Sequence, residues 1–494
     1  MIITDNTPKS PVKDSTPLLG DASASNAPPA YAPPRADPTP IGNTQIPYVV
    51  YQPVYTQQGQ QGQRRTEEPA GRRFCKAFLI AFGIWLLVSA LFGSITAESS
   101  LGYYDYPIPG GVEPSNCATD WPEMTNPDSS DFPYSASTSF DFDLPSKTLL
   151  LLSKGGLSKG HLKITSSPHV ANVRVKVTVN YWKAAVRDAA KVCFIKRSEG
   201  ESGVGIFTPQ PWRSRAYYDR LFFDVELILP HSDPILHVNG LSTDVSNFSH
   251  DVDGLNVYFD DLSLGTSNGK IRANSLTAAQ VALTTSNAAV AIDNLAALKA
   301  SIKSSNGRIT GTYAVVDSLT LKTTNGAIDV AASITGSSSS LERPQDITMQ
   351  TSNGPLNYIV NLGPTAGEAG SFRVKADTTN GNMRGKIVSA PLNSVLAVDA
   401  KTSNNKASLA LPSTYEGSFA ISTSNAAATL EYPPPGQKDP ACGSDAKCKD
   451  RERVVHAGSN KKYSVQGTVH WDPKNARRGN VNLGSSNGAA TLYL

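Results

Sequence analysis

Apolar residues recur at every second position through most of the second half of the chain. Leu262 and Leu264 lie six and four positions before Asn268, and Ile271 and Ala273 lie three and five positions after it. A spacing of two is the period of a β-strand with one buried face, and a helical period does not fit these positions. The pattern predicts two short strands that are joined by a turn at the asparagine.

The same unit recurs along the chain, because a corner of two hydroxyl residues followed by asparagine occurs nine times. The first three intervals between these asparagines are 19 residues each, and later intervals are lengthened by inserts. A fixed period of this length is the signature of a stacked repeat architecture. The repeated asparagines are Asn268, Asn287, Asn306, Asn325, Asn353, Asn380, Asn404, Asn425 and Asn487.

Stacked units of this kind predict an all-β fold, a parallel β-solenoid of about nine rungs. Neighbouring rungs lie about 4.8 Å apart, so the asparagine side chains are expected to hydrogen-bond to one another as a ladder. The chain bends sharply at each corner, and Asn and Gly tolerate the left-handed backbone that such a bend is expected to need. Stacking accounts for the repeated residues, and no catalytic role is assigned to them.

The amino-terminal part has a different composition. Residues 1–73 are rich in Pro, Ser, Thr and Gln and lack apolar periodicity, which predicts a disordered tail because too little surface can be buried to offset the entropy of ordering. The next segment, 74–96, contains 20 uncharged residues from Ala77 to Thr96. A helix of that length crosses about 30 Å of hydrocarbon, so this segment is a predicted transmembrane helix.

Basic residues set the orientation of this predicted span. They gather just before it, from Arg64 to Lys76, and the next Lys or Arg after it is Lys147. The positive-inside rule then keeps the amino terminus in the cytosol. The sequence therefore predicts a single-pass type II membrane protein whose carboxyl-terminal part lies outside the cytosol, at the cell surface or on a vacuolar or endosomal membrane.

Three regions follow the span. Residues 98–135, rich in Pro, Ser and Asp, predict a stalk. Residues 136–240 alternate apolar and polar residues without the repeat, which predicts a β cap, because an uncovered solenoid end exposes strand edges. Residues 241–494 are the predicted solenoid, interrupted by a long insert at 432–462.

Cysteines and a glycosylation sequon agree with a non-cytosolic location. Four cysteines beyond the span allow three pairings, and an oxidising compartment favours two disulfides. We expect them to join Cys117 with Cys193 and Cys442 with Cys448. Asn247, followed by Phe248 and Ser249, is a candidate for N-glycosylation.

The predicted cytosolic tail carries short recognition patterns. A Pro-Pro-x-Tyr ligand for WW domains is formed by Pro28, Pro29 and Tyr31, in which a preformed polyproline segment docks at low entropic cost. An acidic dileucine sorting signal is matched by Asp14, Leu18 and Leu19. These patterns predict a WW-domain protein as a partner and traffic through endosomal membranes.

The sequence gives little support for nucleic-acid binding, nucleophilic catalysis or metal binding. The formal charge of +3 includes no basic block interleaved with aromatic residues, which argues against nucleic acid as a partner. Two corners, Gly265–Gly269 and Gly484–Gly488, match the nucleophile pattern G-x-S-x-G, but that motif needs a strand-to-helix turn. The His and Asp residues between His231 and Asp253 match no metal-ligand spacing and are expected in solvated turns. No catalytic, metal or cofactor site is predicted.

The Thr-Ser-Asn-Gly corner flanked by alternating apolar residues resembles the putative adhesin domain, a family of unknown function found in bacteria and in membrane-tethered fungal proteins. The resemblance covers roughly residues 220–494. It implies a parallel β-solenoid and an adhesive or surface-scaffold role, with a cell-surface glycan or protein as partner. The family brings no catalytic residues, and the insert at 432–462 departs from its pattern.

Three functional classes remain. A non-catalytic adhesive or scaffold ectodomain is favoured, because stacking explains the repeated residues. The second is a trafficking or ubiquitin-ligase adaptor that acts through the cytosolic tail. The third is a β-helix enzyme acting on polysaccharides, which needs carboxylates grouped on one face, for which Asp293, Asp317 and Asp329 are the candidates.

Overall fold

The structure is a computed structural model that describes residues 105–125, 131–336, 343–363, 369–442 and 451–494. These residues belong to one compact unit, Ser94–Leu494. The predicted transmembrane segment 74–96 and the predicted tail lie outside the described residues. Within the described part of the chain, no helix is long and apolar enough to cross a membrane.

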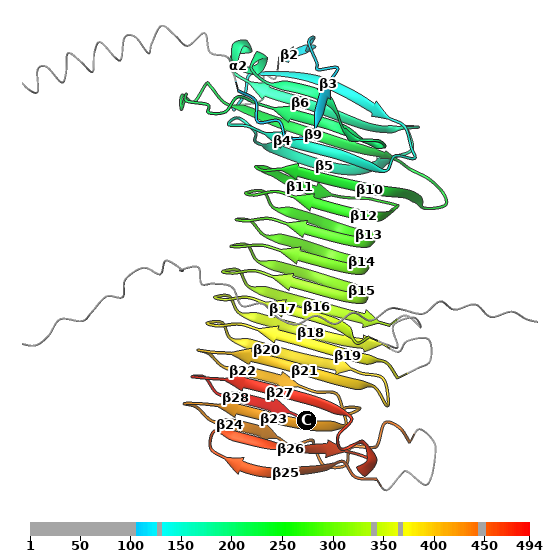
Figure 1. Cartoon of the computed structure of the whole chain (residues 1–494), viewed down its shortest axis with the longest axis vertical. Coiled ribbons are helices and arrows are strands. Elements are labelled where there is room, and N and C mark those ends of the chain that lie inside the picture. The colour runs from blue at the N-terminus through cyan, green and yellow to red at the C-terminus, as the bar shows by residue number, and fades with distance from the viewer. Residues whose placement is uncertain (1–104, 126–130, 337–342, 364–368, 443–450) are drawn as a thin grey trace, which may run out of the picture. The chain divides into compact units, whose positions relative to one another are not determined.

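The described chain is all-β, as predicted. Its 28 strands join into one sheet, and the helical elements are the five-residue α2 (Ala184–Asp188) and the 3-10 turn η3 (Pro473–Asn475). Figure 1 shows the strands stacked one above another, from β2 and β3 at one end to β25 at the other. The alternating sequence pattern therefore does form strands throughout the repeat region.

Three long strands form the middle of the stack: β13 (Ile271–Thr284), β14 (Val290–Lys303) and β15 (Ile309–Lys322). They pair in parallel with a shift of one repeat, so that Ile271 lies beside Val290. In β13 the alternation of buried and other positions shifts twice, at Asn274–Ser275 and at Ala279–Gln280. Each long strand thereby contributes to two ladders, one after its corner and one before the next corner.

The first ladder contains the strands that follow the corners. In order of pairing they are β2 (Glu123–Thr125), β3 (Tyr134–Phe142), β6 (Val173–Tyr181), β9 (Leu221–Pro230), β5 (Gly160–Ser167), β11 (Phe248–Val252), the first parts of β13, β14 and β15, β16 (Ile328–Thr335), β18 (Leu356–Gly363), β20 (Met383–Ser389), β22 (Ala407–Ala410), β28 (Ala490–Tyr493) and β24 (Ala428–Glu431). Pairing is parallel from β9 onward and antiparallel before it.

The second ladder contains the strands that precede the corners. In order of pairing they are β1 (Glu113–Ser115), β7 (Lys191–Ser198), β8 (Glu201–Phe207), β4 (Thr148–Lys154), β10 (Leu236–Val245), β12 (Val257–Gly265), the last parts of β13, β14 and β15, β17 (Gln345–Gln350), β19 (Ser371–Asp377), β21 (Val395–Thr402), β27 (Gly479–Ser485), β23 (Gly417–Thr423), β26 (Ser464–His470) and β25 (Val454–Lys461). Antiparallel pairing occurs at its two ends. Parallel pairing already begins inside the region 136–240.

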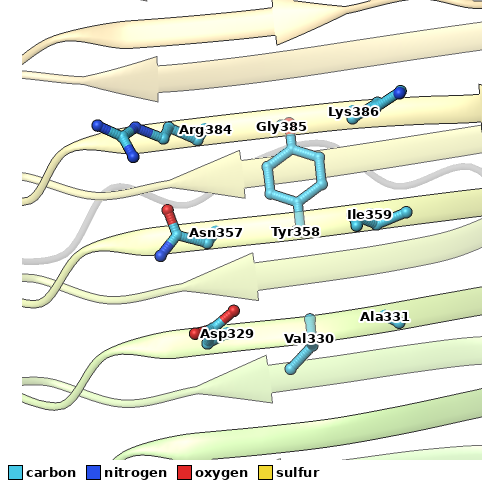
Figure 2. A pocket seen from close by; sticks show the side chains of 9 residues that line it. All are labelled: Asp329, Val330, Ala331, Asn357, Tyr358, Ile359, Arg384, Gly385 and Lys386. Atoms are coloured by element: carbon cyan, nitrogen blue, oxygen red, sulfur yellow. The ribbon is translucent and has the colours of Figure 1, made fainter.

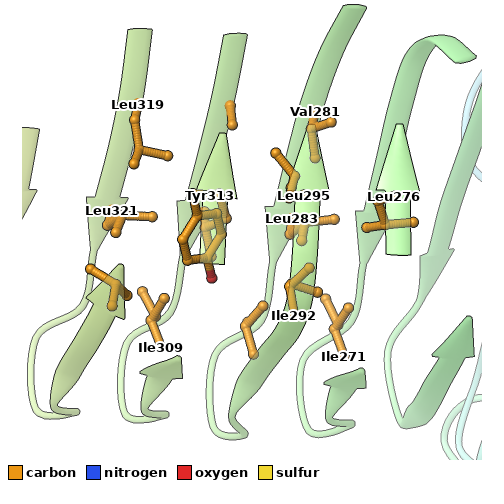
Figure 3. Close-up of a cluster of buried hydrophobic side chains, with 14 of the residues drawn as sticks. Ile271, Leu276, Val281, Leu283, Ile292, Leu295, Ile309, Tyr313, Leu319 and Leu321 are labelled. Carbon is orange, nitrogen blue, oxygen red and sulfur yellow. The ribbon is translucent and has the colours of Figure 1, made fainter. Parts of the chain in front are cut away.

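The core is one continuous column of apolar side chains between the two ladders. Ile271, Leu276 and Leu283 of β13 are at most 2% exposed, and the next strands repeat the arrangement, as Figure 3 shows. Burying a side chain of this size contributes roughly 1.5–3 kcal/mol. Because each strand buries alternate residues, its other side chains point outward in rows along the stack.

Stacking order departs from chain order near the carboxyl terminus. Strand β27 lies between β21 and β23, and β28 lies between β22 and β24, so the last repeat is inserted between two earlier ones. The second half of the insert 432–462 provides the reason. It forms β25, which pairs with β26, and β26 pairs with the outer edge of β23. With that edge covered, β27 pairs with the edges of β21 and β23 that face each other.

Hydrogen bonds between corners fix the register of the repeats. The carbonyl oxygen of Ser305 accepts from the N–H groups of Thr324 and Asn325 in the next corner, at 3.0 and 2.8 Å. The buried hydroxyl of Thr323 accepts from the N–H of Gly326 at 3.1 Å and donates to the Gly307 carbonyl at 3.1 Å. The hydroxyl therefore ties together both its own turn and the corner before it.

The expectation of a left-handed backbone at the corners is wrong. Among the described residues, positive φ angles in that region fall elsewhere, for example at Asn116 and Asn393, and none is at a repeated Thr-Ser-Asn-Gly corner. Glycine is placed there for a different reason. A Cβ on Gly326 would lie 1.9 Å from the carbonyl oxygen of Gly307 in the preceding corner. Close approach of successive backbones, and not handedness, favours glycine.

Replacing this glycine tests the close approach. The substitution Gly326→Val should lower the free energy of unfolding by about 1–3 kcal/mol or more, because the added methyl groups push apart two hydrogen-bonded corners. Gly110→Val is the matched control, since Gly110 is exposed and has no atom within 4 Å of its would-be Cβ. Chemical denaturation compares the two; equal effects would contradict tight corner packing.

Candidate functional site

A groove is formed on the surface by three successive strands of the first ladder, β16, β18 and β20. Their outward side chains stand in two rows by register, one made of Asp329, Asn357 and Arg384 and the other of Ala331, Ile359 and Lys386. The groove between the rows has a volume of about 500 Å³, and Figure 2 shows its lining. A single repeat cannot form it.

The floor of the groove is formed by Tyr358 packed against Gly385. Tyr358 and Gly385 face the core, and the Tyr358 ring fills the space that a side chain at position 385 would need (Figure 2). A Cβ on Gly385 would lie 2.2 Å from the tyrosine ring. The Tyr358 hydroxyl is buried without a hydrogen-bond partner, and burial raises the pKa of this phenol above its usual value.

The groove is lined by one acidic side chain, Asp329, and two basic ones, Arg384 and Lys386. Asp329 faces Arg308 at 3.8 Å, but both side chains are more than half exposed, so water weakens the pair. Among the described residues, no carboxylate lies within 4.0 Å of Arg384 or Lys386. Ile359 adds an apolar side chain that is 47% exposed. Two cations, an amide and an apolar contact suit a ligand that carries hydroxyl or anionic groups.

The three aspartates considered for an enzyme do not come together. Asp329 stands in the outward row that also contains Thr310. Asp293 lies where the register of β14 shifts, and Asp317 lies at the second shift, on β15. Each of the three thus occupies a different row. The groove supplies one carboxylate, whereas glycoside hydrolysis by the usual mechanisms uses two.

The repeated asparagines form one line of side-chain hydrogen bonds. Each Nδ2 donates to the Oδ1 of its neighbour in the stack at 2.5–2.7 Å. The line runs from Asn404 to Asn487 and then to Asn425, following the stacking order and not the chain order. These side chains therefore hydrogen-bond to one another along the stack.

Asn247 is the first member of this line, which the sequence reasoning missed. Its Oδ1 accepts from Asn268 at 2.6 Å, and its Nδ2 donates to the Ser158 carbonyl at 2.8 Å. This corner was not predicted because Val245 stands where the other corners have Thr or Ser, although Ser246 and Asn247 fit the pattern. A glycan on this Nδ2 would replace one of its two hydrogens and would leave one N–H to donate.

The remaining candidates separate into described and undescribed residues. Cys117 and Cys193 form a disulfide that ties the segment after β1 to β7. Cys442 is buried, and Cys448 lies outside the described residues. The WW-ligand residues Pro28, Pro29 and Tyr31 and the sorting-signal residues Asp14, Leu18 and Leu19 also lie outside them.

The His and Asp residues between positions 231 and 253 are dispersed. His237 pairs with Asp260 at 3.1 Å, and Asp244 pairs with Lys154 at 2.6 Å. His250 is not in a solvated turn as expected, because it is 1% exposed, with its Nε2 2.9 Å from the Thr243 hydroxyl. Within the described ranges, no group of three or more His, Cys, Asp or Glu side chains is arranged to hold a metal ion.

Comparison with known proteins adds a family without an assigned function. The family described as "Domain of unknown function (DUF7330)" matches residues 299–432. Two solved structures are similar: a putative cell adhesion protein from Clostridium sporogenes (10% identity, 73% of this chain and 99% of that chain covered, TM-score 0.14) and a putative adhesin from Bacteroides fragilis (9%, 72% and 96%, TM-score 0.24). No curated protein matches the sequence. At such identities and TM-scores, neither structure bears on what this chain binds.

The buried Tyr358 hydroxyl gives a prediction about stability. Tyr358→Phe should raise the free energy of unfolding by about 1 kcal/mol, because it removes a buried polar group that has no partner. Tyr313→Phe is the matched control and should lower it by about 0.5–1.5 kcal/mol, since the Tyr313 hydroxyl donates to the Thr310 carbonyl at 3.1 Å. Denaturant unfolding of both variants distinguishes the two environments, and a loss of stability in Tyr358→Phe would contradict the missing partner.

His250 gives a prediction about pH. Burial lowers the pKa of its imidazole to about 4, and nearby His161 adds to the shift. The unfolded chain binds the proton first, below pH about 6.5, so stability is complete above that pH and falls by roughly 3 kcal/mol as the pH drops to about 4. His250→Gln should lose this component of the pH dependence, whereas exposed His231→Gln should keep it. Thermal unfolding across this pH range measures both.

Proposed function

We propose that the chain is a single-pass type II membrane protein that presents a parallel β-solenoid of about nine repeats as an adhesive or scaffolding surface. Parallel pairing of successive 19-residue repeats around one apolar column supports the solenoid. The basic residues that precede the apolar segment 74–96 support the type II orientation. In this proposal the ectodomain binds cell-surface glycans or proteins and catalyses no reaction.

The groove of Figure 2 is the observation that carries the proposal. It is open along the stack and made by three repeats, so it fits an extended ligand better than a small enclosed substrate. Arg384, Lys386 and Asn357 offer hydrogen-bond donors, and Ile359 offers an apolar contact. A ligand held this way stays exposed to water, which suits attachment more than catalysis.

Binding and cleavage can be measured together on residues 94–494, the compact unit. The protein is applied to immobilised glycans and to intact cells while released reducing ends are followed in the same wells. We expect saturable binding without release of reducing ends. The double variant Arg384→Ala/Lys386→Ala should bind about tenfold more weakly, as loss of two charged contacts implies.

A matched control lies on the same ladder. Arg272 shares the row of Asp329, and Lys270 is nearby, but both lie outside the groove. Lys270→Ala/Arg272→Ala makes the same change in net charge and should leave binding unchanged. Release of reducing ends would replace the adhesive proposal by an enzymatic one, and absence of binding to every glycan and cell would sink it.

A further inference from the structure

The second ladder presents a face of its own on the other side of the asparagine line. Outward positions on β14 are Lys299, Ser301 and Lys303, and those on β15 are Ser318, Thr320 and Lys322. The three lysines, here named the lysine patch, are all exposed. Hydroxyl side chains fill the positions between them.

The lysine patch places like charges close together on neighbouring strands. Lys303 and Lys322 stand directly opposite each other on neighbouring parallel strands, which are about 4.8 Å apart. Like charges at such positions destabilise a sheet. In the part of the chain that the structure describes, no carboxylate lies within 4.0 Å of Lys299, Lys303 or Lys322.

Lysines elsewhere on the same face are neutralised. On β19, Lys375 pairs with Asp377 at 3.4 Å, and on β21, Lys401 pairs with Asp399 at 2.7 Å. Each acid stands two residues from its lysine on the same strand. The fold thus accommodates an acid beside an outward lysine, and β14 and β15 have none at the equivalent positions.

Two hollows adjoin the lysine patch. One, of about 280 Å³, is lined by Lys299 together with Gln280, Ser301 and Thr320. The other, of about 460 Å³, is lined by Lys303 and Lys322 together with corner hydroxyl residues such as Thr324. Each hollow also contains one carboxylate, Asp261 in the first and Asp377 in the second. The Asp377 carboxylate already pairs with Lys375, so it does not neutralise Lys303 or Lys322.

We propose that the lysine patch binds an acidic polysaccharide, a linear glycan that bears carboxylate or sulfate groups. Its charges complement the unpaired ammonium groups, and its hydroxyls match the Ser and Thr side chains between them. Single-stranded nucleic acid fits less well, because no aromatic side chain on β14 or β15 lines either hollow to stack on bases. The inference rests on the proposed binding function and names its ligand class.

The test uses the full chain, purified with detergent present throughout, and fluorescently labelled polygalacturonate as the probe. Lys299→Gln/Lys303→Gln/Lys322→Gln should weaken binding about tenfold at low salt and reduce the dependence of affinity on salt between about 50 and about 200 mM. Lys375→Gln/Lys401→Gln, on the same face, should change affinity less than about twofold, since these lysines already have acid partners.

Folding is followed alongside binding. The patch variant should unfold at the same temperature as the parent or higher, because it relieves repulsion between Lys303 and Lys322, so its weaker binding cannot come from misfolding. Equal losses in both variants, equal binding of neutral dextran, or tighter patch-dependent binding of single-stranded DNA would each overturn the inference. If the chain binds other glycans but polygalacturonate binding ignores the patch, only this inference fails; if no glycan or cell binds, the proposed function fails too.

Discussion

Hydrogen bonding between successive corners is the constraint on which the rest of the structure depends. At most interior corners a carbonyl oxygen accepts two N–H groups from the next repeat, as Ser305 does from Thr324 and Asn325, and a buried hydroxyl such as that of Thr323 bridges the same two corners. A slip of one residue would turn every apolar side chain of a strand outward. The corners therefore decide which side chains enter the core and which line up outside.

Outward rows are the functional consequence of that register. Once the inward positions are committed to the core, the outward ones vary with little effect on folding, and residues from different repeats come together in sequence-distant sets. The groove over β16, β18 and β20 arises in this way after the corners, and the lysine patch arises before them. The asparagine line separates the two faces.

Sequence alone predicted the strands and the core, because a period of two is a local signal that residues such as Leu262 and Leu264 carry plainly. It did not predict the place of β27, since that depends on the hairpin that covers the far edge of β23. The sequence did not predict the groove either, because the packing of Tyr358 under Gly385 is a contact between repeats. Glycine at the corners was predicted for the wrong reason, as backbone spacing has no signature in a single repeat.

Hydrogen exchange at the corners tests the central claim most directly. The backbone amides of Thr324 and Asn325 lie in an exposed turn, yet both donate to the Ser305 carbonyl of the neighbouring repeat. If corner hydrogen bonds fix the register, these amides should exchange as slowly as those of the adjoining strands β15 and β16, since both open only when repeats separate. If these two amides exchange as fast as those of a solvated loop while the strands stay protected, the corner hydrogen bonds do not set the register of the repeats.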